Sequence, residues 1–313
     1  MPNTGGSSFC LTMKYEKPFL PISDQVNLLE ARGLIIDDRD KAEFYLANIS
    51  YYRLSAYMLP FKNKGLETFL EGTTFSKILD AYVFDRELRL LVFDAIERIE
   101  IAFRTQAIYH PAKACGPMWY EDEANYLNKA GLVECFKTID YEIERSKEIF
   151  IQHFKTKYCD QNRPPAWIMF ELLPFGLVSR MCFNLSDYTV REAIGVHFGF
   201  KSTQRDIFES WLQTLVYVRN VCAHHSRLWN RNLVNPPRMM KTTPHPWIKR
   251  NDISIRKLYY FLCTVMYLLS RINPETSFAT RLKALIDDYS HLPISDMDFP
   301  ANWESEPVWN LEK

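Results

Sequence analysis

Glycine is scarce in this sequence, at 10 of 313 residues. Nucleotide-binding α/β folds need glycine-rich loops and turn-dense β-sandwiches need many turn residues, so both classes are disfavoured. The chain is nevertheless 47% hydrophobic and 14% aromatic, which is too apolar for an intrinsically disordered protein. Little glycine together with a large apolar fraction favours long helices around one large core or two smaller ones.

Long apolar runs and paired cysteines are also missing. The most apolar segment, residues 259–269, is shorter than the ~20 residues that a helix needs to cross a bilayer. The N-terminus has no basic stretch followed by an apolar run, as a secretion signal would have. The seven cysteines are never spaced as Cys-x-x-Cys, so they indicate neither a disulfide framework nor a zinc ribbon. We therefore expect a cytoplasmic protein with no membrane partner.

Apolar residues recur at spacings of three and four through most of the chain, which predicts helices. The longest such pattern begins after Thr74 and ends at His110, before a proline. Its acids and bases mostly alternate in sign, so Asp85, Arg89 and their neighbours are expected on a solvated, mutually paired face. Another helix is expected over residues 132–157. No segment shows convincing strand alternation, so the expected fold class is all-α.

These patterns divide the chain into four parts. We expect a flexible N-terminus (1–18), an N-terminal helical part (19–130), a helical bundle (131–290) and an acidic C-terminal tail (291–313). The expected architecture is a multi-helix bundle with the N-terminal helical part packed on it.

Charge is unevenly distributed in a chain whose formal net charge is zero. Residues 219–257 contain nine lysines and arginines and one acid, a local net charge of +8, whereas residues 287–313 have a local net charge of −6. A basic region that also holds histidines and tryptophans suits RNA, which needs charge for its backbone and planar groups for unstacked bases. The alternative is a solvated loop docked on the acidic tail. Six residues of this region are candidate RNA contacts: His225, Arg227, Trp229, Arg231, Lys249 and Arg250.

Arg219, Asn220 and His224 lie close together at the end of an apolar-faced helix. A histidine with a pKa of about 6.5 can take or give a proton at neutral pH, and an arginine can hold a phosphate by two parallel hydrogen bonds. RNA supplies its own nucleophile, the 2′-hydroxyl group. These residue types therefore predict phosphodiester chemistry that needs no metal and no cofactor. Cys222 beside the histidines lacks the second ligand pair of a zinc site.

The spacing of these residues bears on the oligomeric state. Asn220 and His224 share a helix face, whereas Arg219 and His224 diverge by about 140° around an ideal helix. A single chain would have difficulty aiming both side chains at one phosphate. The spacing predicts a homodimer in which two copies of the helix meet across a two-fold axis.

Several strings of this sequence resemble a known family. The R-N-x-x-x-H motif at 219–224 is that of HEPN domains. The strings ISYYRLSAY, FDRELR, AIERIE, PAWIMFELLPFG and RNVCAHHSRLWNR resemble the Abi family of bacterial abortive-infection proteins, of the AbiD and AbiF type. The resemblance runs from about Lys17 to Arg271.

The resemblance implies a role in phage defence and a helical bundle of HEPN type. The HEPN group contains metal-independent endoribonucleases that act as dimers. Carried over by position, Arg219 and His224 would be the catalytic pair and Asn220 the residue that orients them. The resemblance also implies that a structured noncoding RNA could bind and regulate the protein.

Three further residues allow more than one interpretation. Arg104 and His110 satisfy a loose spacing for a second motif, although Thr105 departs from the usual pattern. They could form a second catalytic site, contact RNA, or serve as a helix-end arginine and a capping histidine. Glu171 lies in an otherwise apolar helix, where a buried carboxylate would need a partner. It could form a structural ion pair or orient His224.

The expected function is a metal-independent endoribonuclease that leaves a 2′,3′-cyclic phosphate and a 5′-hydroxyl end. One alternative is a noncatalytic RNA-binding or interaction module that uses the same basic face. Another is a cleft of arginine, asparagine and histidine that binds a mononucleotide as a signal. Trp229 and the second tryptophan of the region, Trp247, are more often core residues than platforms for base stacking, although the flanking arginines and lysine leave stacking open.

Overall fold

The computed structural model describes residues 18–158 and 160–310, and the expected flexible N-terminus lies outside them except for its last residue. Within the described residues the regular elements are twelve α-helices and short 3-10 turns, with no strand. The expected all-α fold class is confirmed. The chain forms two compact units, Met1–Tyr82 and Val83–Lys313. The expected boundary near residue 130 lies inside the second unit.

The first unit contains three short helices. Asp38 caps the second of them by accepting a hydrogen bond from the Lys41 backbone N–H (2.9 Å), as expected for an N-cap residue. Ser50, at φ +72°, ends that helix and caps the next one through a hydrogen bond from the Arg53 backbone N–H. The helices are α1 (Ile22–Ala31), α2 (Arg39–Ile49) and α3 (Tyr51–Met58).

Helix α4 (Phe75–Cys115) begins in the first unit and continues into the second. It runs through Pro111, so the expected end at His110 is wrong. A proline inside a helix removes one backbone N–H and crowds the carbonyl four residues earlier, but its fixed φ is compatible with the helix, and only Ala112–Cys115 follow it before α4 ends. The helix ends instead at Gly116, whose φ of +86° leaves the helical conformation while its N–H still bonds the Ala112 carbonyl (2.9 Å).

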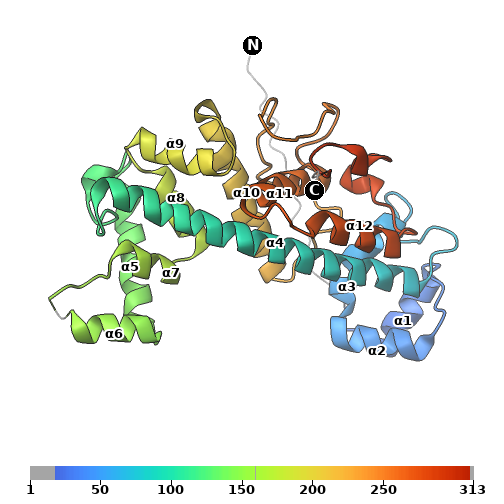
Figure 1. The fold of residues 1–313 in the computed structure, drawn as a ribbon. Helices are drawn as coiled ribbons and strands as arrows, with labels where there is room; N and C mark the ends of the chain where they lie inside the picture. The colour runs from blue at the N-terminus through green and yellow to red at the C-terminus, as the bar shows by residue number, and fades with distance from the viewer. Residues whose placement is uncertain (1–17, 159, 311–313) are drawn as a thin grey trace, which may run out of the picture. The chain divides into compact units, whose positions relative to one another are not determined.

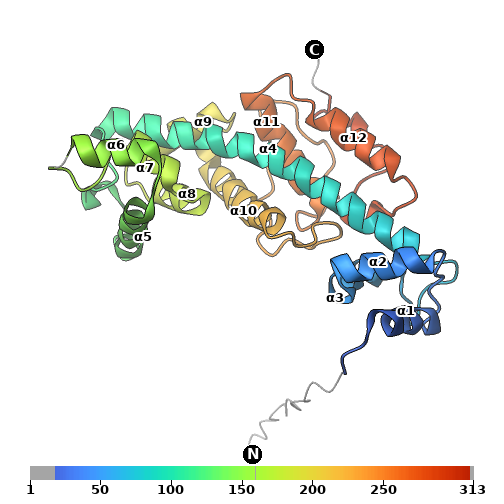
Figure 2. The ribbon, with the colours of Figure 1, turned by 90° about the horizontal axis from the view of Figure 1, so that it is seen from below.

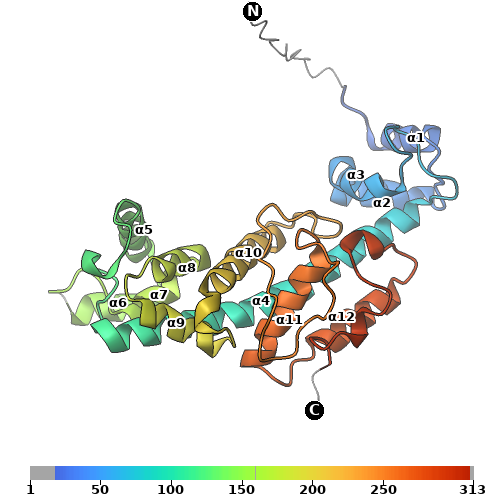
Figure 3. The same ribbon diagram turned by 90° about the horizontal axis from the view of Figure 1, so that it is seen from above.

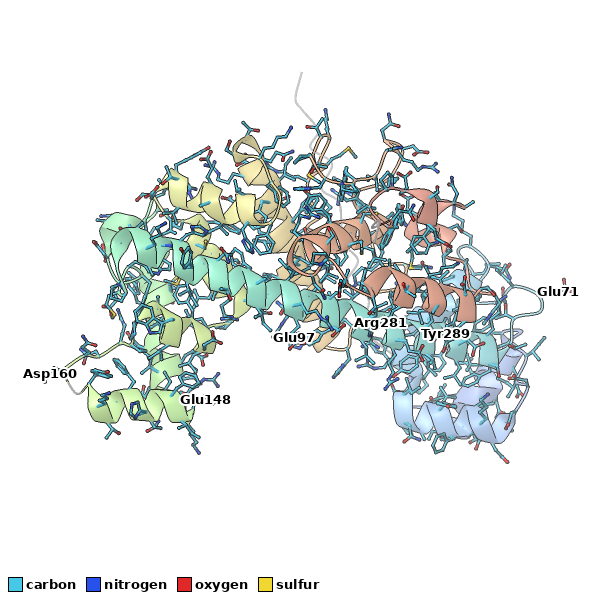
Figure 4. The ribbon with its side chains drawn as sticks, in the orientation of Figure 1. Glu71, Glu97, Glu148, Asp160, Arg281 and Tyr289 are labelled. Carbon is cyan, nitrogen blue, oxygen red and sulfur yellow. The ribbon has the colours of Figure 1, made fainter. Side chains whose placement is uncertain are left out.

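The second unit is a multi-helix bundle built along α4 (Figure 1). Helices α5 to α9 pack near the C-terminal half of α4, α10 and α11 lie nearer its middle, and α12 runs beside its N-terminal half, as Figures 2 and 3 also show. Arg281 of α12, labelled in Figure 4, lies 2.8 Å from Asp94 of α4. The helices after α4 are α5 (Leu132–Arg145), α6 (Ile149–Lys157), α7 (Ala166–Leu172), α8 (Phe175–Phe183), α9 (Tyr188–His197), α10 (Arg205–Ala223), α11 (Leu258–Ile272) and α12 (Phe278–Asp288).

The helix expected over residues 132–157 is two helices, α5 and α6, so that expectation is wrong. Ser146 ends α5 in an extended conformation (φ −69°, ψ 131°), and its hydroxyl accepts a hydrogen bond from the Glu148 backbone N–H (3.2 Å). Serine side chains compete in this way with the helical hydrogen bonds.

Helix α11 forms the centre of the second unit. Every residue from Leu258 to Ser270 is buried, as expected for a helix that is apolar on all sides. Around it lies an aromatic cluster in which Trp211 packs against Trp247, with ring centroids 5.2 Å apart, and Tyr267 packs against both. No helix among the described residues is long and apolar enough to span a bilayer.

Candidate functional site

The end of α10 determines where the motif residues lie. Helix α10 buries Trp211, Leu215 and Val218 on one face, which leaves Arg219 half-buried and Asn220 exposed. The helix stops at His224, with a Ser226 N–H to Val221 carbonyl bond (3.0 Å) and a His225 N–H to Cys222 carbonyl bond (3.1 Å). This pair of bonds is a Schellman motif. It holds His224 at the C-cap, directly after the last residue of α10.

His225 occupies the position of this motif that usually holds glycine, and its φ is +56°. The left-handed conformation costs a non-glycine residue about 1–2 kcal/mol, whereas glycine loses about 0.5–1 kcal/mol more chain entropy on folding. We expect His225→Gly to raise the free energy of unfolding by about 0.5–1 kcal/mol, measured by urea unfolding. His224→Gly is the matched control. The φ of His224 is −88°, so glycine relieves no backbone strain there, and the substitution should lower the free energy of unfolding. A destabilised His225→Gly variant would contradict this explanation of the turn.

Arg219 is held against α4. Its guanidinium carbon lies 5.7 Å from the centroid of the Phe93 ring, and its Nε lies 3.9 Å from an oxygen of Glu100. The Nε atom is buried and makes no hydrogen bond with any described residue, but the side chain as a whole is 39% exposed. Phe93 and Glu100 therefore orient the guanidinium, but they do not satisfy all of its hydrogen-bond donors.

Glu100 also binds Arg104, at 2.7 Å. The Arg104 guanidinium donates further hydrogen bonds to the backbone carbonyls of Phe170 and Leu173 (2.9 Å for the latter), which ties α4 to the junction of α7 and α8. This set of contacts favours the interpretation of Arg104 as a structural arginine. It also fixes Glu100, and through Glu100 the position of Arg219.

Within the described part of the chain, the partners of Arg104 are Glu100, Phe170 and Leu173, and His110 is not among them. Burial lowers the pKa of His110, and the nearby His197 and Lys113 lower it further. The neutral imidazole is favoured, so His110 adds little positive charge at neutral pH. A role for it in binding RNA stays a prediction.

A groove of about 640 Å³ contains Arg219 and Asn220. Arg145 of α5 and Arg180 of α8 also line it, together with Glu100 and Glu142. Arg145 is paired with Glu142 (2.8 Å), whereas Arg180 forms no ion pair with any residue that the structure describes. A second hollow shares Glu142, Arg145 and Leu172 with this groove. The two hollows therefore lie next to each other, and both are lined by basic and acidic side chains.

His224 is not among the residues that line the groove. Its imidazole is exposed and makes no hydrogen bond within residues 18–158 and 160–310. The structure therefore brings Arg219 and Asn220 together in one groove and leaves His224 beside the end of α10. This arrangement agrees with the divergence of Arg219 and His224 around the helix.

Asp85 anchors the turn that follows the motif. Its carboxylate is fully buried and accepts hydrogen bonds from the backbone N–H groups of Leu228 (2.8 Å) and Trp229 (2.6 Å), while Arg89 lies 3.1 Å away. The expectation that Asp85 and Arg89 belong to a solvated face is wrong, because this face of α4 is covered by the turn. The sequence analysis did not predict that Asp85 would hold this turn or that Glu100 would orient Arg219, although both acids lie in the strings FDRELR and AIERIE.

Two of the predicted RNA contacts are used by the fold. Trp229 is fully buried, so the expectation that it stacks on RNA bases is wrong. Its backbone N–H donates a hydrogen bond to the buried Asp85 carboxylate, and this places the indole in the core. Arg231 donates hydrogen bonds to the Arg227 carbonyl (2.6 Å) and to the Tyr217 hydroxyl (3.2 Å), and Arg227 is half-buried.

Glu171 is exposed, so the expectation of a buried carboxylate is wrong. Helix α7 is only seven residues long and buries Ala166, Met169 and Phe170, which leaves Trp167 and Glu171 on its outer face. Within the described residues, no hydrogen bond joins Glu171 to His224. Glu171 instead lines the second hollow, beside Arg145.

Acidic side chains of the tail accept hydrogen bonds from two backbone N–H groups and one side-chain amide of the basic loop between α10 and α11. Asp298 accepts from the Ser254 backbone N–H (2.6 Å), Glu306 from the Lys249 backbone N–H (2.7 Å) and Asp296 from the Asn230 amide (3.3 Å). The Lys249 side chain is exposed, whereas Arg250 is exposed but paired with Asp252 (2.8 Å).

The part of the chain that the structure describes contains no group of three or more histidines, cysteines, aspartates or glutamates placed to hold an ion. Cys222 is buried, and burial raises the pKa of its thiol to about 12.

The sequence model of the Abi-like protein family matches residues 44–230, more than half of the chain. The chain belongs to the Abi-like protein family. The matched span contains Asp85, Glu100 and the motif at the end of α10. Family membership confirms the resemblance at the level of the family and suggests abortive-infection phage defence. The HEPN motif and the AbiD or AbiF type stay predictions. No curated protein and no solved structure matches the chain.

Proposed function

We propose that this Abi-like protein is a metal-independent endoribonuclease of HEPN type that acts in phage defence in the cytoplasm. The observation that carries the proposal is the placement of the motif: Arg219 is oriented in a groove, and Asn220 and His224 are exposed at the end of the same helix. A 2′-hydroxyl group attacks the adjacent phosphorus, and the bond from phosphorus to the 5′ oxygen breaks. The products are a 2′,3′-cyclic phosphate and a 5′-hydroxyl end.

Arg219 is proposed to bind the scissile phosphate. The guanidinium can make two parallel hydrogen bonds to the phosphate and stabilise the charge that develops in the transition state. Glu100 and Phe93 hold the side chain in place, so little conformational entropy is lost when RNA binds. Asn220, one residue on, is proposed to orient the phosphate or the imidazole.

His224 is proposed to transfer protons, and this role favours a homodimer. The reaction needs a base for the 2′-hydroxyl proton and an acid for the 5′ oxygen. One chain supplies a single motif histidine, and that histidine does not line the groove of Arg219. A second copy across a two-fold axis would supply the other histidine and bring each one to its partner's arginine.

RNA cleavage in the presence of EDTA tests the proposal. Purified protein should cut single-stranded RNA without added metal, and the products should carry 2′,3′-cyclic phosphate ends. Sequencing of RNA that remains bound after purification tests regulation by a noncoding RNA. Binding of RNA without cleavage under all conditions would favour the noncatalytic RNA-binding module instead.

RNA affinity is expected to fall steeply with salt, because counterions are released when the basic loop contacts several phosphates. Each lost phosphate contact reduces the slope of log affinity against log salt by about 0.7 for a single strand. Lys249→Glu should weaken binding and flatten this slope, measured by fluorescence anisotropy. Lys137→Glu is the matched control, because Lys137 is an exposed lysine of α5 that is paired with Glu134. Salt-insensitive binding would contradict the proposed use of the basic loop.

A further inference from the structure

Arg180 of α8 lies in the same groove as Arg219. It is exposed, and its guanidinium makes no ion pair and no hydrogen bond within the part of the chain that the structure describes. Two guanidinium groups that share a groove repel each other, so the fold gains no electrostatic stability from placing both of them there. A bound anion with more than one charge would offset this repulsion.

Helix α8 packs closely against α10, and Figure 3 shows the two helices side by side. At one end of the contact, a Cβ atom added to Gly176 would lie only 3.2 Å from Cγ1 of Val216, and both of these residues line the groove. At the other end, the rings of Phe183 and Phe208 have centroids 6.2 Å apart. Residue numbers rise along α8 while they fall along α10, so the two helices are antiparallel.

This packing places the two arginines toward opposite ends of the groove. Arg180 follows Gly176 by one turn of α8, which is about 6 Å along the helix axis. Arg219 follows Val216 by almost one turn of α10, which is about 4.5 Å along that axis. Residues at these spacings share a helix face with the residue at the contact. Because the helices are antiparallel, the two displacements add, and the two arginines are separated by roughly 10 Å along the helix axes.

The two carboxylates of the groove are already paired with arginines. Glu142 accepts two hydrogen bonds from the Arg145 guanidinium (2.8 and 3.1 Å), and its side chain is 13% exposed. Glu100 lies 2.7 Å from Arg104, and its side chain is 16% exposed. The Arg145 side chain is 59% exposed, so the arginines reach further into solvent than the carboxylates. The charges that a ligand meets first in this groove are therefore positive.

We infer that Arg180 binds a second phosphate of the RNA strand whose scissile phosphate lies at Arg219. This inference rests on the proposed function and concerns the same groove. A stacked strand advances by about 3.4 Å per nucleotide, so a separation of roughly 10 Å corresponds to about three nucleotide steps. Arg180 is a positioning residue, because its guanidinium can hold a phosphate by parallel hydrogen bonds and does not touch the reacting atoms.

The second contact defines the class of substrate. A strand of roughly four nucleotides or more can reach both arginines, whereas a mononucleotide or a dinucleotide carries no phosphate at the required distance. A phosphate contact positions a strand but reads no base, so Arg180 favours longer strands without selecting a sequence. The contact lies outside the reacting bond, and its binding energy therefore lowers KM more than it raises kcat.

Binding of an uncleavable strand tests the contact without any reaction. The probe is 2′-O-methyl decauridylate, whose blocked 2′ oxygen cannot attack the phosphorus. Arg180→Gln should lower its affinity by about tenfold and reduce the slope of log affinity against log salt by about 0.7, measured by fluorescence anisotropy. Arg180→Lys should keep the slope, because it keeps the charge. Arg86→Gln, the matched control, removes an exposed arginine of α4 outside the groove and should leave both quantities unchanged.

Cleavage of strands with one neutral linkage locates the contacted phosphate. Each substrate is an oligothymidylate with a single uridine, which fixes the scissile bond, and with one methylphosphonate, which removes the charge of one other phosphate. For the wild type, a methylphosphonate about three steps from the scissile bond should raise KM by about tenfold and leave kcat nearly unchanged. The same replacement should have no further effect on Arg180→Gln, because the partner of that charge is already absent.

An unchanged affinity and salt slope in Arg180→Gln would overturn the inference, as would no binding of the uncleavable strand. A wild type that tolerates a methylphosphonate at every position except the scissile one would overturn it without any variant. An Arg180→Gln defect of equal size with every methylphosphonate substrate would assign Arg180 a structural role. Failure to cleave any RNA would contradict the proposed function alone, because the salt slope on the uncleavable strand still decides whether Arg180 contacts a phosphate.

Discussion

Replacing Arg219 or His224 with alanine is expected to lower RNA cleavage by about 10²–10⁴-fold and leave the fold intact. Loss of a general acid or base, or of one preorganised donor to a developing charge, costs a factor of this size. Arg219 is 39% exposed, and the imidazole of His224 is exposed. Neither truncation therefore opens a core cavity. The measurement is single-turnover cleavage of a labelled RNA in EDTA, with thermal unfolding recorded on the same samples.

Two residues of this chain serve as matched controls. Arg205 lies on the same helix, stacks on Tyr188 at 4.4 Å and lies 3.5 Å from Glu209, which resembles the environment of Arg219. His197 is an exposed histidine in the last turn of α9. Arg205→Ala and His197→Ala should cleave at nearly the wild-type rate. Equal losses in the controls and in the motif variants would reject the catalytic assignment.

Mixed dimers extend the same experiment. A mixture of Arg219→Ala and His224→Ala chains should regain part of the activity, because one of the two shared sites then combines an intact arginine with an intact histidine. The amount regained measures how the site is divided between the chains. Full cleavage by a monomer at nanomolar concentration would rule out a shared site.

Replacing Asp85 with alanine is expected to lower the free energy of unfolding by about 3–5 kcal/mol, the usual cost of removing one partner of a buried ion pair. Arg89 would remain buried without its counterion, and the backbone N–H groups of Leu228 and Trp229 would lose their acceptor. An unsatisfied buried donor costs about 1–3 kcal/mol. Urea unfolding monitored by circular dichroism gives the value.

Asp94→Ala is the control for this experiment. Asp94 lies on the same helix and pairs with Arg98 and Arg281, but it is partly exposed. Removing it should cost at most about 1 kcal/mol, as for other surface ion pairs. A similar small cost for Asp85→Ala would show that the turn after the motif does not depend on the buried carboxylate.

The local sequence determined the helical class and the place of the motif. Apolar spacing in a helix depends on neighbours three and four residues away, so the periodicity alone predicted an all-α chain and put Arg219, Asn220 and His224 near a helix end. Local signals also had limits, because they missed the break at Ser146 and the continuation of α4 through Pro111. The break depends on the hydrogen bond from the Glu148 backbone N–H to the Ser146 hydroxyl, which a periodic pattern does not contain, and the continuation depends on a proline that the last turns of the helix accommodate.

Only the tertiary structure decided which polar residues are buried and which are exposed. Periodicity tells which residues share a face, but a face is buried only if a distant segment covers it. Asp85 is buried because a turn 143 residues further along the chain covers it, and Trp229 follows that turn into the core. Glu171 is exposed because nothing covers the outer face of α7, and Arg104 is engaged by carbonyls of Phe170 and Leu173. The desolvation of each group comes from contacts distant in sequence, which no local pattern specifies.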